Sequence, residues 1–253
     1  MKTEDLLREN ERIDDLEING FRIIQNPFCF CFGMDAVLLA NFANISPKAD
    51  VLDLGTGTGI VPLLLAAKSK GRSWTGLEIQ SEMVDMAERS VKLNSVEDKC
   101  HIVEGDLRNI RDIFKPGQFG AVTSNPPYMK ESSGLKNTKD TVVIARHEVC
   151  ATLEDVVQAA SYLLKTSGTF TMVHRPTRLP EIMELMVKYR LEPKRMQLVQ
   201  PRANKEPNLV LIEGVKEAGR ECRMLPTLTV YDEEGNYTEE LLKYYGKESE
   251  SNI

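Results

Sequence analysis

The chain has 253 residues, of which 42% are apolar, and its 38 Asp and Glu outnumber its 32 Lys and Arg, giving a formal net charge of −6. This apolar content suffices for one large buried core, so we expect a single domain or one domain with a small appendage. No run approaches the roughly 20 apolar residues of a membrane-spanning helix, and residues 1–10 lack the apolar core of a secretory signal. We therefore expect a soluble, cytoplasmic protein without a membrane partner.

The cysteines argue against two common uses of this residue type. They are five in number, they include no CxxC pair, and no histidine cluster accompanies them. Neither a disulfide framework nor a zinc site is predicted, and we expect no metal cofactor. The five thiols, which we expect to be reduced and mostly buried, are Cys29, Cys31, Cys100, Cys150 and Cys222.

The first 45 residues predict an arm and a helix ahead of the main sheet. Residues 18–32 combine short apolar alternation with the turn-forming pairs Asn19-Gly20 and Asn26-Pro27, which is typical of a small hairpin or an extended arm. Residues 35–43 (DAVLLANFA) predict a buried helix with an acidic first turn, and Ser46-Pro47 ends it.

The middle of the chain alternates segments typical of strands and of helices, which predicts an α/β fold with a mostly parallel sheet covered on both faces. The last two strands, with short proline-bearing connections around them, predict an antiparallel pair at the sheet edge. A polar segment at 130–140 predicts a loop, and the acidic tail contains one further helical segment at 238–245. The predicted strands are 51–54, 73–77, 100–103, 121–124, 169–173, 196–199 and 209–212, and the helices are 60–68, 81–93, 152–165 and 178–189.

We therefore divide the chain into an N-terminal arm with a helix (1–45), a main α/β domain (46–215) and a C-terminal tail (216–253).

A glycine loop follows the first predicted strand. Residues 51–59 read VLDLGTGTG, so three glycines at alternate positions lead from a buried strand into a helix. Glycines let the backbone turn tightly and present N–H groups to a polar or anionic ligand at a helix N-terminus. A nucleotide-like cofactor is expected, because a mere tight turn needs only one glycine. An NAD site is disfavoured, because the third place of the dinucleotide fingerprint falls on Ile60.

Acidic residues end the next two strands. Glu78 lies 21 residues beyond Gly57, where a carboxylate can meet two ribose hydroxyls, although an exposed acid at a strand end is also common. Asp106 follows the third strand in the segment EGDL. Together with Asp53, these acids lie on the carboxyl side of one sheet, and as a set they are more specific than any one of them.

Asn125-Pro126-Pro127-Tyr128 directly follows the fourth predicted strand. Two consecutive prolines fix the backbone and leave carbonyl acceptors in set directions. Asn125 Oδ1 and the Pro126 carbonyl can accept both hydrogens of an exocyclic amine, and the Tyr128 ring offers a face on which a planar group stacks. In isolation, a Pro-Pro pair more often simply ends a strand.

These motifs resemble those of the class I methyltransferases. In that family, the loop with Asp53, Gly55, Gly57 and Gly59 faces the methionine part of S-adenosylmethionine, and Asp106 and the Leu107 N–H meet the adenine ring. The four residues Asn125 to Tyr128 resemble the NPPY or DPPY motif of amino-methyltransferases, which act on adenine, cytosine, guanine or a glutamine amide. The resemblance implies a seven-stranded sheet of the Rossmann-like, doubly wound type, with S-adenosylhomocysteine as product. The implied cofactor-binding set also includes Thr56, Ile79 and Asn125.

A narrower resemblance rests on residues 23–25 (IIQ), 30–40 (FCFGMDAVLLA), 145–148 (ARHE) and 201–208 (PRANKEPN). These segments are similar to the bacterial valine-tRNA adenine-N6 methyltransferases, and the resemblance covers nearly the whole chain. It implies methylation at N6 of the adenine 3′ of the anticodon (position 37), with tRNA as partner and a monomer or weak homodimer. It also implies that Phe30, Gly33 and Asp35 lie near the cofactor, although Asp35 can equally be an ordinary first-turn acid. The residues expected to contact RNA, besides Tyr128, are Arg146, His147, Arg202 and Lys205.

The distribution of charge gives weak support for an RNA partner. Residues 129–223 carry sixteen Lys and Arg against twelve Asp and Glu, a net of +4, whereas the segments 1–128 and 224–253 each carry a net of −5. Phosphate contacts dominate nucleic-acid affinity, so the overall negative charge argues against such a partner. Mixed charge exposed for solubility explains the local basic excess at least as well.

Four alternatives remain. A release-factor glutamine methyltransferase shares the NPPY motif but usually has a sizeable helical domain before the glycine loop, where this chain has about fifty residues. A base methyltransferase acting on another RNA or on DNA is a second alternative. An NAD-dependent oxidoreductase is disfavoured, because this chain lacks the required glycine spacing and an obvious hydride-relay pair. A catalytically silent binding module would predict a broken Asn125 or Tyr128, and both residues are intact.

Overall fold

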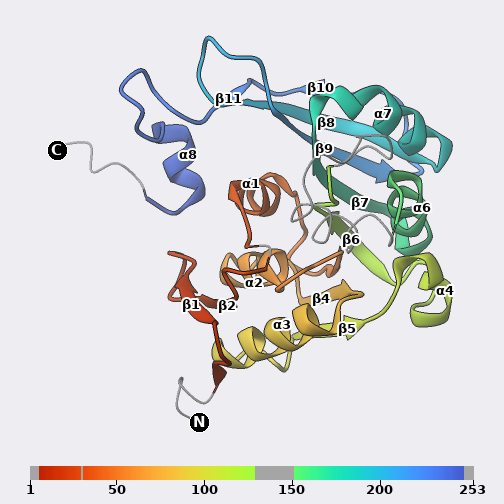
Figure 1. The fold of residues 1–253 in the computed structure, drawn as a ribbon. Helices are drawn as coiled ribbons and strands as arrows, with labels where there is room; N and C mark the ends of the chain where they lie inside the picture. The colour runs from red at the N-terminus through yellow and green to blue at the C-terminus, as the bar shows by residue number, and fades with distance from the viewer. Residues whose placement is uncertain (1–5, 30, 129–150, 248–253) are drawn as a thin grey trace, which may run out of the picture.

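A computed structural model describes residues 6–29, 31–128 and 151–247 of the protein. Its centre is a twisted sheet with helices on both faces (Figure 1). The seven long strands lie in the order β8-β9-β7-β6-β3-β4-β5, and all pair in parallel except β9, which is antiparallel to both its neighbours. The predicted α/β class with a mostly parallel sheet and an antiparallel pair is thus confirmed. These strands are β3 (Asp50–Leu54), β4 (Ser73–Glu78), β5 (Cys100–Glu104), β6 (Phe119–Ser124), β7 (Leu164–His174), β8 (Leu191–Gln200) and β9 (Leu209–Lys216).

The helices form two layers around the sheet, each with its own apolar core. In Figure 1 the helices of one layer lie on the side of the N-terminal hairpin, and those of the other layer lie on the opposite side. Strand β3 is buried on both faces as a result, from Val51 to Leu54. The first layer contains α1 (Met34–Phe42), α2 (Ile60–Ala67) and α3 (Ser81–Leu93), and the second contains α4 (Ile110–Ile113), α6 (Leu153–Leu163) and α7 (Leu179–Lys188).

Thr152 caps the N-terminus of helix α6 in a capping box. Its hydroxyl accepts the Asp155 N–H, and the Asp155 carboxylate accepts the Thr152 N–H, so two of the otherwise unpaired N–H groups of the helix terminus are satisfied. The helix ends at Leu163, and β7 begins at the next residue, five residues before the predicted start. The boundary prediction was wrong because Gly168 does not interrupt the strand. The pairing of β7 with β6 shifts register here, because Phe119 pairs with Leu164 and Ala121 pairs with Thr169, so β7 carries extra residues at its start.

The predicted turn at Asn19-Gly20 joins β1 (Arg12–Asp15) to β2 (Arg22–Gln25), and both turn residues have positive φ. The first strand of this hairpin lies upstream of the segment that the sequence analysis assigned to it. Its four residues, RIDD, are mostly polar and too few to show an alternating pattern. The hairpin is held both by the buried Ile23 and Ile24 and by polar contacts.

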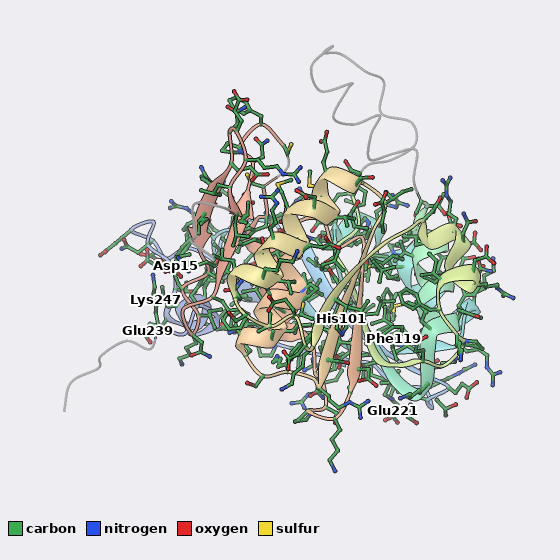
Figure 2. All side chains as sticks on the ribbon, turned by 90° about the horizontal axis from the view of Figure 1, so that it is seen from below. Asp15, His101, Phe119, Glu221, Glu239 and Lys247 are labelled. Atoms are coloured by element: carbon green, nitrogen blue, oxygen red, sulfur yellow. The ribbon has the colours of Figure 1, made fainter. Side chains whose placement is uncertain are left out.

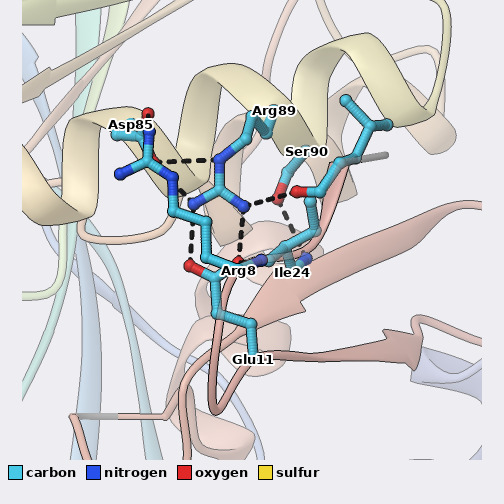
Figure 3. A network of polar contacts seen from close by, with 7 residues as sticks. Arg8, Glu11, Ile24, Asp85, Arg89 and Ser90 are labelled. Atoms are coloured by element: carbon cyan, nitrogen blue, oxygen red, sulfur yellow. Dashed lines mark hydrogen bonds and ion pairs between the residues drawn. The ribbon is translucent and has the colours of Figure 1, made fainter. Parts of the chain in front are cut away.

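Figure 3 shows these contacts between the N-terminal residues and α3. Arg89 of α3 forms two hydrogen bonds with the Glu11 carboxylate, and its guanidinium also bonds to Asp85. The side chains of Arg89 and Glu11 are 11% and 6% exposed, so this ion pair is largely shielded from water. Ser90 Oγ accepts the Ile24 N–H at 2.9 Å. The hairpin is therefore fixed to the helix that follows β4.

The residues after β9, which the sequence assigns to a tail, pack against the sheet and against α1. Two short strands, β10 (Arg223–Met224) and β11 (Leu228–Thr229), run parallel to β8, and helix α8 (Glu239–Tyr244) lies beside α1. Leu241 of α8 is fully buried. Figure 2 shows labelled residues of α8 and the following turn on the same side of the molecule as the hairpin, where Lys247 forms an ion pair with Glu17 at 2.7 Å. No helix in the described part of the chain is long and apolar enough to cross a membrane.

Candidate active site

A cavity of about 1600 Å³ lies at the carboxyl ends of the parallel strands, where ligands bind in open α/β sheets. Its walls come from the ends of β3, β4, β5, β6 and β7, from the start of α1 and from the connection between β8 and β9. Most of the residues predicted from the sequence line it together. These are Gly33, Asp35, Asp53, Gly55, Thr56, Gly57, Glu78, Ile79, Asp106, Leu107, Asn125, Pro126, Pro127 and Tyr128.

The three glycines of the loop after β3 have two different roles. All three have positive φ, at 71° for Gly55, 56° for Gly57 and 81° for Gly59. A Cβ added to Gly55 or Gly57 would meet nothing within 4 Å, so open space of the cavity lies over both. A Cβ on Gly59 would instead lie 3.2 Å from Ala87 Cβ of α3. Gly59 therefore permits close helix packing at the start of α2 and does not line the cavity.

Asp53, at the end of β3, is a buried carboxyl group. Its side chain is shielded almost completely, and the Thr123 hydroxyl donates to Oδ1 at 2.6 Å. Burial raises the Asp53 pKa to about 7, and the hydrogen bond from Thr123 only partly offsets this effect. The group is therefore ready to change charge near neutral pH when a cation approaches it.

Glu78, at the end of β4, ties the glycine loop to the neighbouring strand. Its Oε2 accepts the Gly57 N–H at 2.8 Å, and its Oε1 accepts the N–H groups of Ile79 and Gln80 at 3.0 Å each. The position of this carboxylate in the sequence predicts that it faces ribose hydroxyls. The structure adds that the same group fixes the shape of the loop.

Asp106 caps the short 3₁₀ helix after β5. Its carboxylate accepts the Arg108 N–H at 2.9 Å and pairs with the Arg108 guanidinium at 2.6 Å. The hydrogen bonds from Arg108 hold the Asp106 pKa below its usual value. Asp106 is thus an ionised acceptor at the cavity wall.

The end of β6 carries Asn125, Pro126, Pro127 and Tyr128 into the cavity. The Tyr128 hydroxyl lies 2.6 Å from the side-chain amide of Asn125 and 2.8 Å from Asp35 Oδ2. Asp35 belongs to the first turn of α1, so this contact joins the N-terminal arm to the strand end. Burial and the neighbouring Asp35 charge raise the Tyr128 pKa, so the hydroxyl keeps its proton.

A family comparison adds to this geometry. The family model described as "Methyltransferase small domain" matches residues 33–189, more than half of the chain. The chain belongs to that family. The match begins at Gly33 and includes the glycine loop, the three acids and the Asn125 to Tyr128 segment, so it covers most of the cavity wall of this methyltransferase.

Relatives of this methyltransferase are similar over most of their length. A tRNA1(Val) (adenine(37)-N6)-methyltransferase from Bacteroides thetaiotaomicron is 30% identical over 83% of this chain and 81% of its own. One of the same description from Porphyromonas gingivalis (strain ATCC 33277) is 28% identical over 91% and 92%, respectively. The predicted membership in this group of adenine-N6 methyltransferases is thereby confirmed.

Solved structures show the same fold. A predicted O-methyltransferase from Agrobacterium tumefaciens has a TM-score of 0.68 and 21% identity, over 84% of this chain and 96% of that one. P. horikoshii TYW2 in complex with MeSAdo has a TM-score of 0.59 and 14% identity, over 83% and 73%.

Two residues of the site were missed by the sequence analysis, His174 and Arg175 at the end of β7. The His174 and Tyr128 rings form a T-shaped contact with 5.2 Å between their centroids, and the Arg175 guanidinium lies 4.9 Å from the Tyr128 ring centre. Burial lowers the His174 pKa to about 4, so this imidazole is neutral at physiological pH. The signal that could have found both is their place directly after a parallel strand, at the edge that carries Asp53 and Asn125.

The residues expected to bind RNA are placed differently from the cavity residues. Arg202 and Lys205 are exposed on the connection between β8 and β9, and neither lines the cavity. Pro201 and Asn208, at the two ends of that connection, do line it. Phe30, Arg146 and His147 lie outside the described residues.

Proposed function

We propose that this methyltransferase transfers a methyl group from S-adenosylmethionine to the exocyclic N6 of an adenine in tRNA, at position 37 of a valine tRNA. The observation that carries the proposal is the position of Asn125, Pro126, Pro127 and Tyr128 at the end of β6, in the same cavity as the glycine loop. The description of the relatives supports the choice of adenine and of tRNA.

The chemistry of the cavity fits the proposed cofactor. The open space over Gly55 and Gly57 leaves room for a ligand against the loop backbone. Both residues have positive φ, which favours glycine, so no side chain fills that space. Three carboxyl groups at successive strand ends, Asp53, Glu78 and Asp106, offer acceptors for an amino group, ribose hydroxyls and an adenine amine. When bound, S-adenosylmethionine supplies an electrophilic methyl group on a sulfonium centre.

The strand-end segment binds and orients the amine. An exocyclic amine on adenine is a weak nucleophile because its lone pair is delocalised into the ring. Asn125 Oδ1 and the Pro126 carbonyl can accept its two hydrogens, which turns the lone pair out of the ring plane. As nitrogen gains the methyl group it loses one of these hydrogens as a proton, which then passes to water. The described residues contain no cluster of acidic, His or Cys side chains suited to a metal ion.

We expect the cavity to take up a base from a loop more easily than a base from a duplex. A base beside the anticodon is unpaired, so turning it into a pocket costs less than opening a base pair. Arg175 is exposed and covers part of the Tyr128 ring, so it can stack on an incoming base or contact an adjacent phosphate. Arg202 and Lys205 are exposed on the connection between β8 and β9, whose ends at Pro201 and Asn208 line the cavity, so they can contact the backbone of the loop.

Purified variants test the catalytic assignment. Asn125→Ala should reduce methyl transfer to unfractionated tRNA at least a hundredfold, because one of two acceptors for the amine is lost, while S-adenosylhomocysteine affinity stays within about twofold. Glu82→Ala, an exposed first-turn acid of α3, is the control for handling of the protein. Full activity of Asn125→Ala would contradict the assignment. Methylation of a release factor rather than tRNA by the wild type would favour the glutamine reaction.

A further inference from the structure

The contacts of the Tyr128 hydroxyl with Asp35 and Asn125 require more hydrogens than the hydroxyl has. The Tyr128 oxygen lies 2.8 Å from Asp35 Oδ2 and 2.6 Å from Asn125 Oδ1, so both neighbours are within hydrogen-bond distance. A phenol has one hydrogen, and a carboxylate has none to give. Two acceptors cannot both be served by that single hydrogen with good geometry.

A half-turn of the Asn125 amide resolves the shortage. The oxygen and nitrogen of a carboxamide have nearly the same shape, so Nδ2 can take the place of Oδ1 beside Tyr128. Asn125 Nδ2 then donates to the Tyr128 oxygen, and the Tyr128 hydroxyl donates to Asp35. Each contact becomes a normal hydrogen bond, and the last one is strengthened because its acceptor is charged. The half-turn also moves Oδ1 away from Tyr128.

Asp35 is well fixed to act as the final acceptor. Its Oδ1 accepts the Ala36 N–H at 3.0 Å, which leaves Oδ2 for Tyr128. The first turn of α1 favours a negative charge at this position. Gly33 leaves room for the carboxylate, since a Cβ there would lie 2.9 Å from Asp35 Oδ1.

The arm that carries Asp35 is itself tied to the hairpin. The buried side chain of Gln25 accepts the Phe32 N–H at 3.1 Å and donates to Asp14 at 3.1 Å. The position of the carboxylate therefore depends on the hairpin that α3 holds.

We infer that Asp35 is a positioning residue for methyl transfer: through the Tyr128 hydroxyl it holds the Asn125 amide with Oδ1 turned toward the substrate amine. The inference rests on the proposed function, because it assigns Asn125 Oδ1 to that amine. Without the Asp35 acceptor, the Tyr128 hydroxyl donates to Asn125 Oδ1 and withdraws this oxygen from the substrate.

A double-mutant cycle separates this role from direct cofactor binding. Asp35→Ala and Tyr128→Phe should each lower kcat about tenfold, and the double variant should lose no more than either single one, because both act on one chain of hydrogen bonds. S-adenosylhomocysteine affinity should stay within about twofold in all three. Asp35→Asn, which keeps an oxygen acceptor, should retain more activity than Asp35→Ala, and Glu82→Ala serves as the matched first-turn control. Losses that multiply to about a hundredfold, or an affinity loss equal to the kcat loss in Asp35→Ala, would overturn the inference.

A second measurement needs no substrate, so it separates failure of this inference from failure of the proposed function. In ¹⁵N-resolved NMR spectra, the side-chain amide protons of Asn125 can be assigned by their loss in Asn125→Asp. If Nδ2 faces Tyr128, Tyr128→Phe moves one of these two proton signals upfield, whereas an amide with Oδ1 facing Tyr128 leaves both essentially unmoved. An unmoved pair overturns the inference even if tRNA is methylated, and a moved pair supports it even if the substrate is another amine.

Discussion

The affinity of the free enzyme for S-adenosylhomocysteine should fall about tenfold between pH 8 and pH 6, and Asp53 is the group responsible. Burial raises the pKa of this carboxyl group to about 7, so it is mostly protonated at pH 6 and mostly ionised at pH 8. A ligand that carries an ammonium group favours the ionised form, so it lowers the Asp53 pKa and releases a proton on binding. Affinity therefore rises with pH through this window and levels off above it.

The folded protein responds to the same group in the opposite direction. A carboxyl group whose pKa is higher in the folded than in the unfolded state contributes stability at low pH, and this contribution is lost as pH rises through about 7. Ligand binding then restores in part what ionisation removes. The ligand should consequently raise the melting temperature more at pH 8 than at pH 6.

Titration calorimetry at pH 6, 7 and 8 measures the affinity, and buffers of different ionisation enthalpy reveal the released proton. Thermal melts with and without the ligand at pH 6 and pH 8 measure the effect on stability. Asp53→Asn is the control, because its side chain stays neutral at every pH and can still accept the Thr123 hydroxyl. This variant should bind weakly and without the pH dependence. An affinity of the wild type that is flat from pH 6 to 8, or an equal slope in Asp53→Asn, would refute the reasoning.

Two further predictions concern the frame around the site. Gly59→Ala should lower the free energy of unfolding in urea by about 1–2 kcal/mol, because a φ of 81° strains any residue with a Cβ and the new methyl lies 3.2 Å from Ala87. An unchanged urea midpoint would contradict this prediction and show that the loop relaxes freely. Arg89→Met should lower it by about 3 kcal/mol, because the Glu11 carboxylate, 6% exposed, loses its partner. Adding Glu11→Gln to Arg89→Met should recover part of that loss, and additive losses in the double variant would contradict the ion pair.

The cavity residues that the sequence predicted share one physical property. Asp53, Glu78, Asp106 and Asn125 each lie within two residues of the carboxyl end of a strand, and parallel strands bring their carboxyl ends to one edge. Short-range pattern and topology therefore suffice to bring them together. The separate packing role of Gly59 could not be predicted, because it depends on the approach of α3.

Contacts between distant segments were beyond the reach of the sequence pattern. Asp35 and Tyr128 are 93 residues apart, and nothing in the spacing of either points to the other. His174 directly follows the predicted strand 169–173, but no motif marks it. The packing of residues after β9 also escaped prediction, because a few buried residues such as Val230 and Leu241 are scattered through an acidic segment.

The measurement that tests the central claim most directly is methyl incorporation into total tRNA from a strain that lacks this protein. Purified enzyme and labelled S-adenosylmethionine are added, and the tRNA is digested to nucleosides and mapped. The account predicts label in N6-methyladenosine, at the adenine 3′ of the anticodon of a valine tRNA. Label in another nucleoside, or no label in tRNA while a release factor becomes methylated, would contradict it.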